Sequence, residues 1–411
     1  MSSKTSNEQI HQANLKAWLA VIAVALAIFA VVSAEMLPIG LLTPIAESMQ
    51  QSVGHTSLII STPSLVAAIV APCVVLVFNC INRRQLLLFF MLLLFISTLV
   101  SAMTDTFHWL LLARVLFGMS MGGIWALAGT LAVRLMPPAQ VGIATSIIFS
   151  GIAAASVLGI PAGVYLGDLF GWRMAFICVA ILVGIVFVML FWSLPSLPVN
   201  KVSSLKSSLT VLKKPNVIIG LALTLLIVTG HFSAYTFVRP VLQEISQFSD
   251  ASIGALLLIY GVFGILGNFV LGFTIQKFLW QTLFSIAFLL SATLLLFIFF
   301  GDFLYLNIVL FLIWGFAYGG VSVSLMTWMI RSAPTQLELA AAFNVAVFNL
   351  SIGLGAFAGG LIYDGIGLWL NLVFASVLTF IAVMVVFLNR SKQAGRNLAL
   401  SAESKHIKYD L

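Results

Sequence analysis

The sequence predicts an all-α membrane protein whose twelve transmembrane helices form two parallel-repeat halves of six helices each. Three observations predict this fold class: the composition, the number of long apolar runs, and a repeat between the halves. The chain of 411 residues is 62% hydrophobic and only 8% charged, with a mean hydropathy of +1.16. Because soluble domains carry about 25% charged residues, the composition alone indicates an integral membrane protein.

Twelve apolar segments are long enough to be membrane spans. A helix needs about 20 predominantly apolar residues to cross a bilayer. These segments mix helix-forming residues with the small residues that let helices pack closely in lipid, and they lack the alternating pattern of a transmembrane barrel. The predicted spans are residues 17–42, 56–80, 85–103, 107–134, 141–166, 173–194, 217–238, 252–276, 281–300, 303–330, 337–363 and 368–389.

The longest polar interruption lies between the sixth and seventh spans. It is rich in proline, serine and lysine, which is typical of a linker. The sequence therefore divides into five parts. They are an N-terminal tail (1–16), a six-helix half (17–194), a basic linker (195–216), a second six-helix half (217–389) and a C-terminal tail (390–411).

The charges between spans predict the orientation in the membrane. Loops rich in Lys and Arg stay on the cytoplasmic side, and most of the 19 Lys and Arg residues fall on the side that also holds both termini. We therefore expect both termini to be cytoplasmic, in a bacterial inner membrane, and we attribute the basic pI to topology and lipid contact rather than to nucleic-acid binding. The cations on this side are Lys4, Lys16, Arg83, Arg84, Arg134, Lys201, Lys206, Lys213, Lys214, Lys277, Arg331, Arg390, Lys392, Arg396, Lys405 and Lys408.

The opposite side is predominantly acidic. Its cations are Arg173 and Arg239, and one further cation, Arg114, lies within the fourth span. This asymmetry supports the predicted orientation. The acidic residues on this side are Glu47, Asp105, Asp168, Glu244, Asp250, Asp302 and Asp364.

The two halves repeat one another in order and in register. Residues of the first, fourth and fifth spans recur 196 or 197 positions later, which indicates a duplicated six-helix unit. Parallel repeats in one membrane chain are typical of alternating-access transporters with a site between the halves. The recurring pairs include Glu35 with His231, Pro44 with Pro240, Gly118 with Gly315, Gly159 with Gly355, Gly163 with Gly359 and Asp168 with Asp364.

Glu35 is the only charge in the first span, and the repeat pairs it with His231. An ionisable side chain at that depth is a functional hypothesis by default. Because the apolar surroundings favour its neutral form, Glu35 is suited to bind a proton on one side and release it on the other. The alternative is a carboxylate permanently paired with a neighbouring helix. We expect Glu35 and His231 to lie at equivalent depths and to face the space between the halves.

At this point the sequence resembles the major facilitator superfamily, and within it the drug:proton antiporters. The resemblance covers about residues 15–390 and rests on Arg114–Gly118 in the fourth span, on Gly159–Gly163 in the fifth, and on Gly171-Trp172-Arg173. Pro161 stands one place later than is usual in that family. The resemblance implies proton coupling through Glu35, and a hinge or closure role for Gly118, Gly159, Pro161 and Gly163.

Within this superfamily the chain is similar to bacterial sugar-efflux and purine-ribonucleoside efflux pumps, and slightly more to the second group. Four segments carry this similarity: residues 35–42, 134–138, 193–198 and 327–332. One motif departs from the family pattern. The loop between the second and third spans keeps its basic pair, Arg83 and Arg84, but has Asn79 where the family has an aspartate. An amide hydrogen-bonds more weakly than a carboxylate does.

Two further residues are candidates for proton coupling. Arg114 keeps its charge and needs a partner or a wet cavity, so it either biases the protonation of Glu35 or pins neighbouring helices. His231 is either a coupling residue between the halves or a neutral, hydrogen-bonded core residue.

Several polar and aromatic residues within the spans are candidates for substrate contact. Amides in hydrocarbon need hydrogen-bond partners, so they either join helices or bind substrate. Aromatic rings can stack on a flat ligand, although many serve as packing or interfacial anchors. The candidate substrate-binding residues are Tyr235, Asn344, Asn349, Trp125, Trp314 and Tyr318.

These observations predict a transporter rather than an enzyme. No Gly-x-x-x-x-Gly-Lys-Ser/Thr loop is present to bind ATP, no cluster has metal-ligand spacing, and no catalytic constellation is visible. We therefore expect no cofactor, and as partners a small-molecule substrate, protons and membrane lipid, with the chain a monomer. The preferred interpretation is proton-coupled export of purine ribonucleosides by alternating access. The alternatives are sugar or multidrug efflux with the same coupling, or a membrane sensor that transports nothing.

Overall fold

A computed structural model describes residues 2–78, 81–198, 211–301, 303–334 and 336–409, with side chains described except at 2–14, 75–76, 129–130, 251, 337–338 and 391–409. Within these residues there is no β-strand, and 12 helical segments are long and apolar enough to cross a membrane. Apart from the terminal extensions of the first and last helices, the helices that form these segments match the twelve predicted spans to within a few residues. The structure thus confirms the predicted fold class.

The first half contains six spans, two of which are built from several consecutive helical pieces. The second span joins α3 to α4, and the fifth joins η1, α7, the π-helical turn η2 and α8. The elements of this half are α1 (Ser2–Gly40), α2 (Leu42–Ser48), α3 (Val53–Thr56), α4 (Leu58–Leu76), α5 (Arg83–Met103), α6 (Phe107–Leu135), η1 (Pro138–Gln140), α7 (Val141–Ala154), η2 (Ala155–Gly159), α8 (Ile160–Phe170) and α9 (Trp172–Ser193).

The second half also contains six spans, and its fourth joins α15 to α16. The helix α18 continues past the membrane span, which ends at Arg390. The elements of this half are α11 (Pro215–Tyr235), α12 (Val238–Pro240), η3 (Val241–Ile245), α13 (Asp250–Lys277), α14 (Leu279–Phe300), α15 (Leu304–Gly319), α16 (Val321–Ser332), α17 (Leu337–Gly365) and α18 (Leu368–Tyr409).

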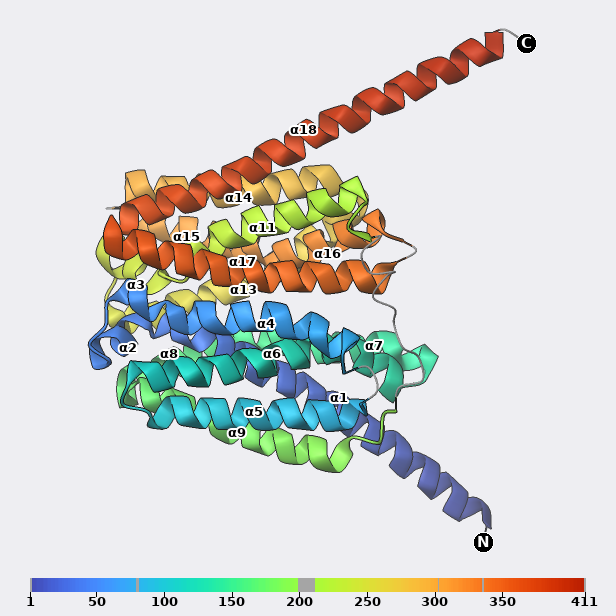
Figure 1. The fold of residues 1–411 in the computed structure, drawn as a ribbon, viewed down its shortest axis with the longest axis vertical. Helices are drawn as coiled ribbons and strands as arrows, with labels where there is room; N and C mark the ends of the chain where they lie inside the picture. Colours follow the sequence, from blue (N-terminus) through green and yellow to red (C-terminus); the bar gives the residue numbers. More distant parts are fainter. Residues whose placement is uncertain (1, 79–80, 199–210, 302, 335, 410–411) are drawn as a thin grey trace.

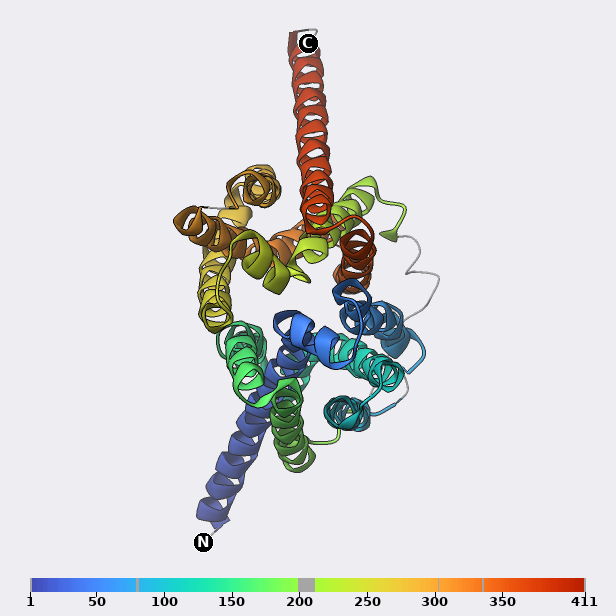
Figure 2. The ribbon, with the colours of Figure 1, turned by 90° about the vertical axis from the view of Figure 1, so that its left-hand side faces the viewer.

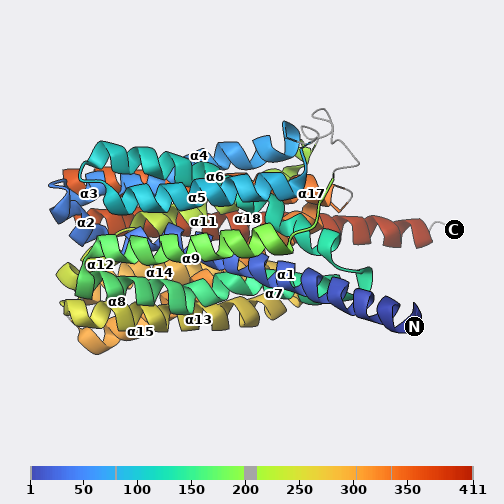
Figure 3. The ribbon, with the colours of Figure 1, turned by 90° about the horizontal axis from the view of Figure 1, so that it is seen from below.

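The helices form two groups that lie side by side (Figure 1). The blue-to-green helices of the first half form one group and the yellow-to-red helices of the second half form the other, also when the bundle is viewed along its helices (Figure 2). Both termini project from the same end of the bundle (Figure 3). We call this the terminal end, and we call the opposite end, which holds α2 and α3, the distal end.

The backbone preserves the repeat in its unusual conformations. Gly171 and Gly367, 196 positions apart, both have positive φ angles, of 88° and 116°, directly before the sixth and twelfth spans. Gln50 and Gln247, 197 positions apart, also have positive φ angles, of 52° and 54°. Non-glycine residues adopt such angles rarely, so the two halves share turn geometry even where their side chains differ.

Two seams join the halves. In the first, α4 packs against α17, and in the second, α13 packs against α8 and η2. The π-helical turn η2 lies immediately before Pro161, which lacks the backbone N–H that a regular helix would use at that position. The irregular part of the fifth span therefore lies directly on a seam between the halves.

Four charged or polar positions of the sequence analysis lie outside the described residues. They are Asn79 in the loop between the second and third spans, Lys201 and Lys206 in the linker, and Asp302. The basic neighbours of Asn79 are described. Arg83 Nη1 donates to the carbonyl of Phe78 at 3.0 Å, and Arg84 Nη2 donates to that of Phe191 at 2.7 Å.

Candidate functional site

Glu35 lies on α1, five residues before the helix ends at Gly40. Its side chain is partly exposed, and no hydrogen bond or ion pair is described for it. The carboxylate is near enough to Tyr318, on α15 of the other half, to interact with it electrostatically. Glu35 thus lies within electrostatic range of the second half, and none of the ion pairs among the described residues includes it. Its position facing a space between the halves stays a prediction.

His231 lies on α11 and is fully buried. Its Nδ1 accepts a hydrogen bond of 3.0 Å from the indole N–H of Trp314. Its ring is stacked between those of Tyr318 (centroids 3.5 Å apart) and Tyr235 (5.0 Å apart). Tyrosine rings cover both faces of the His231 ring, so the expectation that His231 faces the space between the halves stays a prediction.

Arg114 is enclosed in the first half, on α6. Its Nη2 donates to Ser101 Oγ at 2.7 Å, and its guanidinium lies over the rings of Phe117 and Phe176 at 4.9 and 5.1 Å. Its Nε and Nη1 find no hydrogen-bond partner within the described ranges. The structure does not pair Arg114 with Glu35, so any effect of this charge on Glu35 acts at a distance or in another conformation.

The two candidate asparagines both lie on α17 and are nearly buried. Asn344 Oδ1 accepts a hydrogen bond of 2.9 Å from Thr224 on α11, which joins these two helices. Asn349 Nδ2 donates to the carbonyl of Val345 in its own helix. Of the two roles weighed from the sequence, the contact of Asn344 favours the joining of helices.

The candidate aromatic residues differ in their surroundings. Tyr235, Trp314 and Tyr318 all pack around His231, but only Tyr318 is partly exposed, while Trp314 is fully buried. Trp125 is partly exposed on α6 in the other half. The structure thus brings three of these residues together with His231 and leaves Trp125 apart from them.

The small residues of the fourth and fifth spans pack closely on neighbouring helices. A Cβ atom added to Gly118 would lie 2.5 Å from the carbonyl oxygen of Pro63 on α4, and one added to Gly159 would collide with Ser33 on α1. Gly163 packs against Leu37 on α1. Gly159 and Gly163 therefore hold the fifth span directly against the turns of α1 that flank Glu35.

The sequence analysis missed the contacts that hold the distal end together. Arg239, on α12 and buried, donates to Asp168 at the end of α8 and to Asp250 at the start of α13, each at 3.0 Å. It also donates to the carbonyl of Gly40 at 2.9 Å. We call this group the Arg239 latch. It joins the second half to α1 and α8 of the first.

The other seam has an equivalent contact. Asp364, near the end of α17, accepts hydrogen bonds from the backbone N–H of Gly54 at 2.9 Å and from the Ser52 hydroxyl. We call this the Asp364 latch. Asp168 and Asp364 are equivalent in the repeat, so each half uses the same acidic position to reach the other half. The recurrence of these aspartates was visible in the sequence, but their partners were not.

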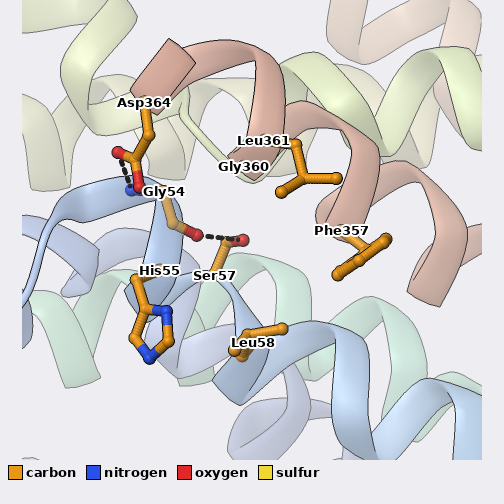
Figure 4. Close-up of a pocket in the computed structure, with 8 residues that line it drawn as sticks. All are labelled: Gly54, His55, Ser57, Leu58, Phe357, Gly360, Leu361 and Asp364. Atoms are coloured by element: carbon orange, nitrogen blue, oxygen red, sulfur yellow. Dashed lines mark hydrogen bonds between the residues drawn. The ribbon is translucent and has the colours of Figure 1, made fainter.

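A small pocket lies beside the Asp364 latch (Figure 4). Its walls include Leu58, Phe357 and Leu361, and the last two are exposed on the outer surface of the bundle. Both carboxylate oxygens of Asp364 already accept hydrogen bonds. The pocket is therefore the outer edge of the α4–α17 seam rather than a built binding site.

Comparison with known proteins agrees with this arrangement. Residues 24–338 match the Major Facilitator Superfamily. The chain is 30% identical over 372 residues to the purine ribonucleoside efflux pump NepI of Shigella sonnei, covering 90% of this chain and 93% of that protein. It is also 30% identical over 397 residues to the transcription regulatory protein OpdE of Pseudomonas aeruginosa, covering 95% of this chain and 98% of that one.

Solved structures share the fold at low sequence identity. A bacterial homologue of the human lysosomal transporter Spinster aligns with a TM-score of 0.72 at 15% identity, over 91% of this chain and 96% of that one. The human organic anion transporter MFSD10 aligns with a TM-score of 0.62 at 17% identity, over 91% and 99% of the two chains. With its twelve spans and duplicated halves, this chain belongs to the major facilitator superfamily of membrane transporters.

Proposed function

We propose that this protein exports purine ribonucleosides from a bacterial cell in exchange for protons, by alternating access across the inner membrane. Membership in the superfamily supports transport, and the name of the NepI relatives supports the direction and the substrate. The observation that supports the coupling is Glu35, which is partly exposed, lies within electrostatic range of Tyr318 in the other half, and has no ion-pair partner in the described part of the chain. An intramembrane acid in this setting is suited to carry a proton.

The proposed topology places the terminal end in the cytoplasm, because Lys and Arg are concentrated there. The Arg239 and Asp364 latches then close the bundle toward the exterior. In this conformation substrate reaches the site from the cytoplasm and disfavours the proton on Glu35. Rocking of the halves opens the latches, substrate leaves, and Glu35 is reprotonated from the more acidic exterior.

A Glu35→Gln variant tests the coupling in proteoliposomes that contain the full-length protein. The amide keeps the shape of the side chain but carries no exchangeable carboxyl proton, so we expect nucleoside transport driven by a pH gradient to be lost. Counterflow down a nucleoside gradient should persist. Glu47→Gln, which changes an exposed acid on α2, is the matched control. Undiminished uphill transport by Glu35→Gln would exclude this role of Glu35.

A second candidate function is a membrane sensor that binds ligand without transporting it. The similarity to OpdE, a protein named as a transcription regulator, favours this alternative. The two functions differ in flux. A transporter loaded with unlabelled inosine should exchange it for labelled inosine in a counterflow assay, whereas a sensor should bind inosine and show no exchange.

A further inference from the structure

We propose that His231 and Tyr260 are the hydrogen-bond donors that recognise the substrate, and that this substrate is a neutral molecule with hydroxyl, carbonyl or ring-nitrogen acceptors. The inference rests on the proposed function and names the recognition chemistry of its site. It assigns His231 to substrate binding rather than to proton coupling, and it adds Tyr260, which the sequence analysis did not single out.

Four rings from three helices form a stacked column in the second half. The order is Tyr318, His231, Tyr235 and Tyr260, with centroid separations of 3.5, 5.0 and 5.0 Å and interplanar angles of 7°, 22° and 23°. Trp314 packs edge-on against the last three of these rings. Because both faces of the imidazole are covered, a ligand can contact His231 only through the edge of the ring.

The contact with Trp314 determines which nitrogen of His231 carries the proton. An indole N–H is a donor only, so Nδ1, which receives it at 3.0 Å, is the unprotonated acceptor. The neutral imidazole then carries its hydrogen on Nε2. Trp314 is therefore a positioning residue that orients the ring and fixes its tautomer.

Two donors of this cluster are buried and have no hydrogen-bond partner among the residues that the structure describes. They are Nε2 of His231 and the hydroxyl of Tyr260. Nearly all buried polar groups in native proteins are hydrogen-bonded, so each exception needs an explanation. Ring packing holds these two donors rigidly, and the substrate of this transporter is proposed to bind between the halves. Their lack of a protein partner is explained if the substrate supplies the acceptors.

One end of the column, Tyr318, lies within electrostatic range of the coupling residue Glu35 on the other half. Tyr260, at the opposite end of the column, stacks on Tyr235 with ring centroids 5.0 Å apart. The second half thus presents neutral donors, and the first half presents one acid. This combination favours a neutral ligand that is rich in hydrogen-bond acceptors. A cationic ligand would need a second carboxylate, because Glu35 loses its negative charge when it is protonated.

Removal of one hydroxyl tests the donor role. In purified full-length protein, we expect Tyr260→Phe to weaken inosine binding about 10- to 100-fold by calorimetry, because the substrate acceptor then lacks its buried partner. The ratio of protons to substrate transported should stay unchanged. Tyr165→Phe, which removes an exposed hydroxyl from α8, is the matched control. Unchanged affinity in Tyr260→Phe would overturn the proposal.

Analogues that each lack one acceptor sharpen this test. The set is 2′-, 3′- and 5′-deoxyinosine, 7-deazainosine and nebularine. One of these should bind the wild-type protein weakly and lose no further affinity in Tyr260→Phe, since the missing acceptor and the missing donor are partners. An equal additional loss for every analogue would indicate a structural role of Tyr260 and would contradict the proposal.

The tautomer can be measured without any substrate. Two-bond ¹H–¹⁵N spectra distinguish the two neutral forms of histidine and the cation. We expect His231 to carry hydrogen on Nε2 in the wild type and to lose this single form in Trp314→Phe. Trp172→Phe is the control, because that indole N–H, in the first half, has no hydrogen-bond partner. A wild-type His231 protonated on Nδ1, or on both nitrogens, would overturn the assignment.

Failure of the proposed function is distinguishable from failure of this inference. A wild-type protein that binds lactose but not inosine would exclude the nucleoside, and the same Tyr260→Phe comparison with deoxygenated sugars would still test the donors. A protein that binds ethidium and neither neutral probe would overturn the inference.

Discussion

Arg114 shows how this protein holds a permanent cation inside a membrane helix bundle without a carboxylate. It is 1% exposed, donates to one serine hydroxyl, and lies over two phenylalanine rings. Cation–π contacts of a desolvated guanidinium are worth about 2 kcal/mol. The equivalent of Arg114 in the repeat is Phe311, which packs against Tyr260 and Trp314. One half therefore stabilises an isolated charge at a position where the other packs only rings.

Ser101→Ala tests the contribution of the single hydrogen bond of Arg114. The substitution leaves another buried N–H group of a charged side chain without a partner, so we expect a loss of about 1–3 kcal/mol in stability. The measurement is the thermal unfolding midpoint of the purified protein. Ser146→Ala, which removes an exposed hydroxyl bonded within its own helix, should leave the midpoint unchanged. Equal midpoints for the two variants would contradict this account of Arg114.

At the scale of single residues, the sequence predicted which groups are unusual but not what they contact. Glu35 stood out because a lone acid in an apolar span is costly. Tyr260 gave no such signal, since its role depends on rings from α11 and α15 that are far away in sequence. The Asn344 contact with Thr224 was one of two open alternatives, because an amide can bond equally to a helix or to a ligand.

The length of each apolar segment determines where a membrane-spanning helix forms. Small residues determine where two helices can pack closely. Gly118 lies where α6 crosses α4, against the backbone of Pro63. The backbone of a membrane helix cannot yield as a flexible side chain does, so this position tolerates no side chain without separating the two helices.

Gly118→Ala should therefore destabilise the first half. We expect a loss of about 1–3 kcal/mol from overpacking, measured as a lower unfolding midpoint. Gly142→Ala is the matched control, because nothing lies within 4 Å of the added atom and alanine is the better helix former. A midpoint for Gly118→Ala at or above that of Gly142→Ala would show that α4 and α6 can separate freely.

At the scale of elements, the sequence predicted all twelve spans and missed most of their internal breaks. The first span was expected to reach Leu42, whereas α1 ends at Gly40 and α2 begins at Leu42. The π-helical turn before Pro161 and the break between α15 and α16 were not predicted. Such breaks depend on packing between helices that are distant in sequence, and apolar length carries no information about them. The π-helical turn lies against Gly261 of α13 in the other half, and Gly319 packs on the backbone of Gly264 of α13 in its own half.

The whole molecule is held in one conformation by the Arg239 and Asp364 latches at the distal end. Both depend on an aspartate in the same position of the repeat, and both connect one half to the other. Alternating access requires them to break and reform, so their strength contributes to the free-energy difference between the two conformations.

Asp168→Ala and Asp364→Ala should shift this equilibrium toward a conformation that is open at the distal end. The assay is labelling of Ser57→Cys, a buried position on the α4–α17 seam, by an impermeant maleimide in a background without Cys73, Cys80 and Cys178. We expect labelling to accelerate several-fold, because Asp168→Ala takes one carboxylate from the buried Arg239 guanidinium and Asp364→Ala removes two hydrogen bonds between the halves. Asp105→Ala, which removes an exposed ion pair within the first half, should have no effect.

The repeat predicted the two-half architecture from the sequence, whereas the conformation was not predictable in the same way. Which end is closed depends on a small free-energy difference between two arrangements of the same helices. That difference comes from long-range pairs such as Arg239 with Asp168, which no local pattern identifies.

The unequal side chains of the repeat also have a consequence for how a bound molecule lies. A bundle of two identical halves would offer a ligand two indistinguishable poses, related by a half-turn about the axis between them. Here that degeneracy is removed, since Glu35 stands on one side of the axis and His231, its equivalent, on the other. A nucleoside held between them would therefore bind in one orientation rather than in two equivalent ones.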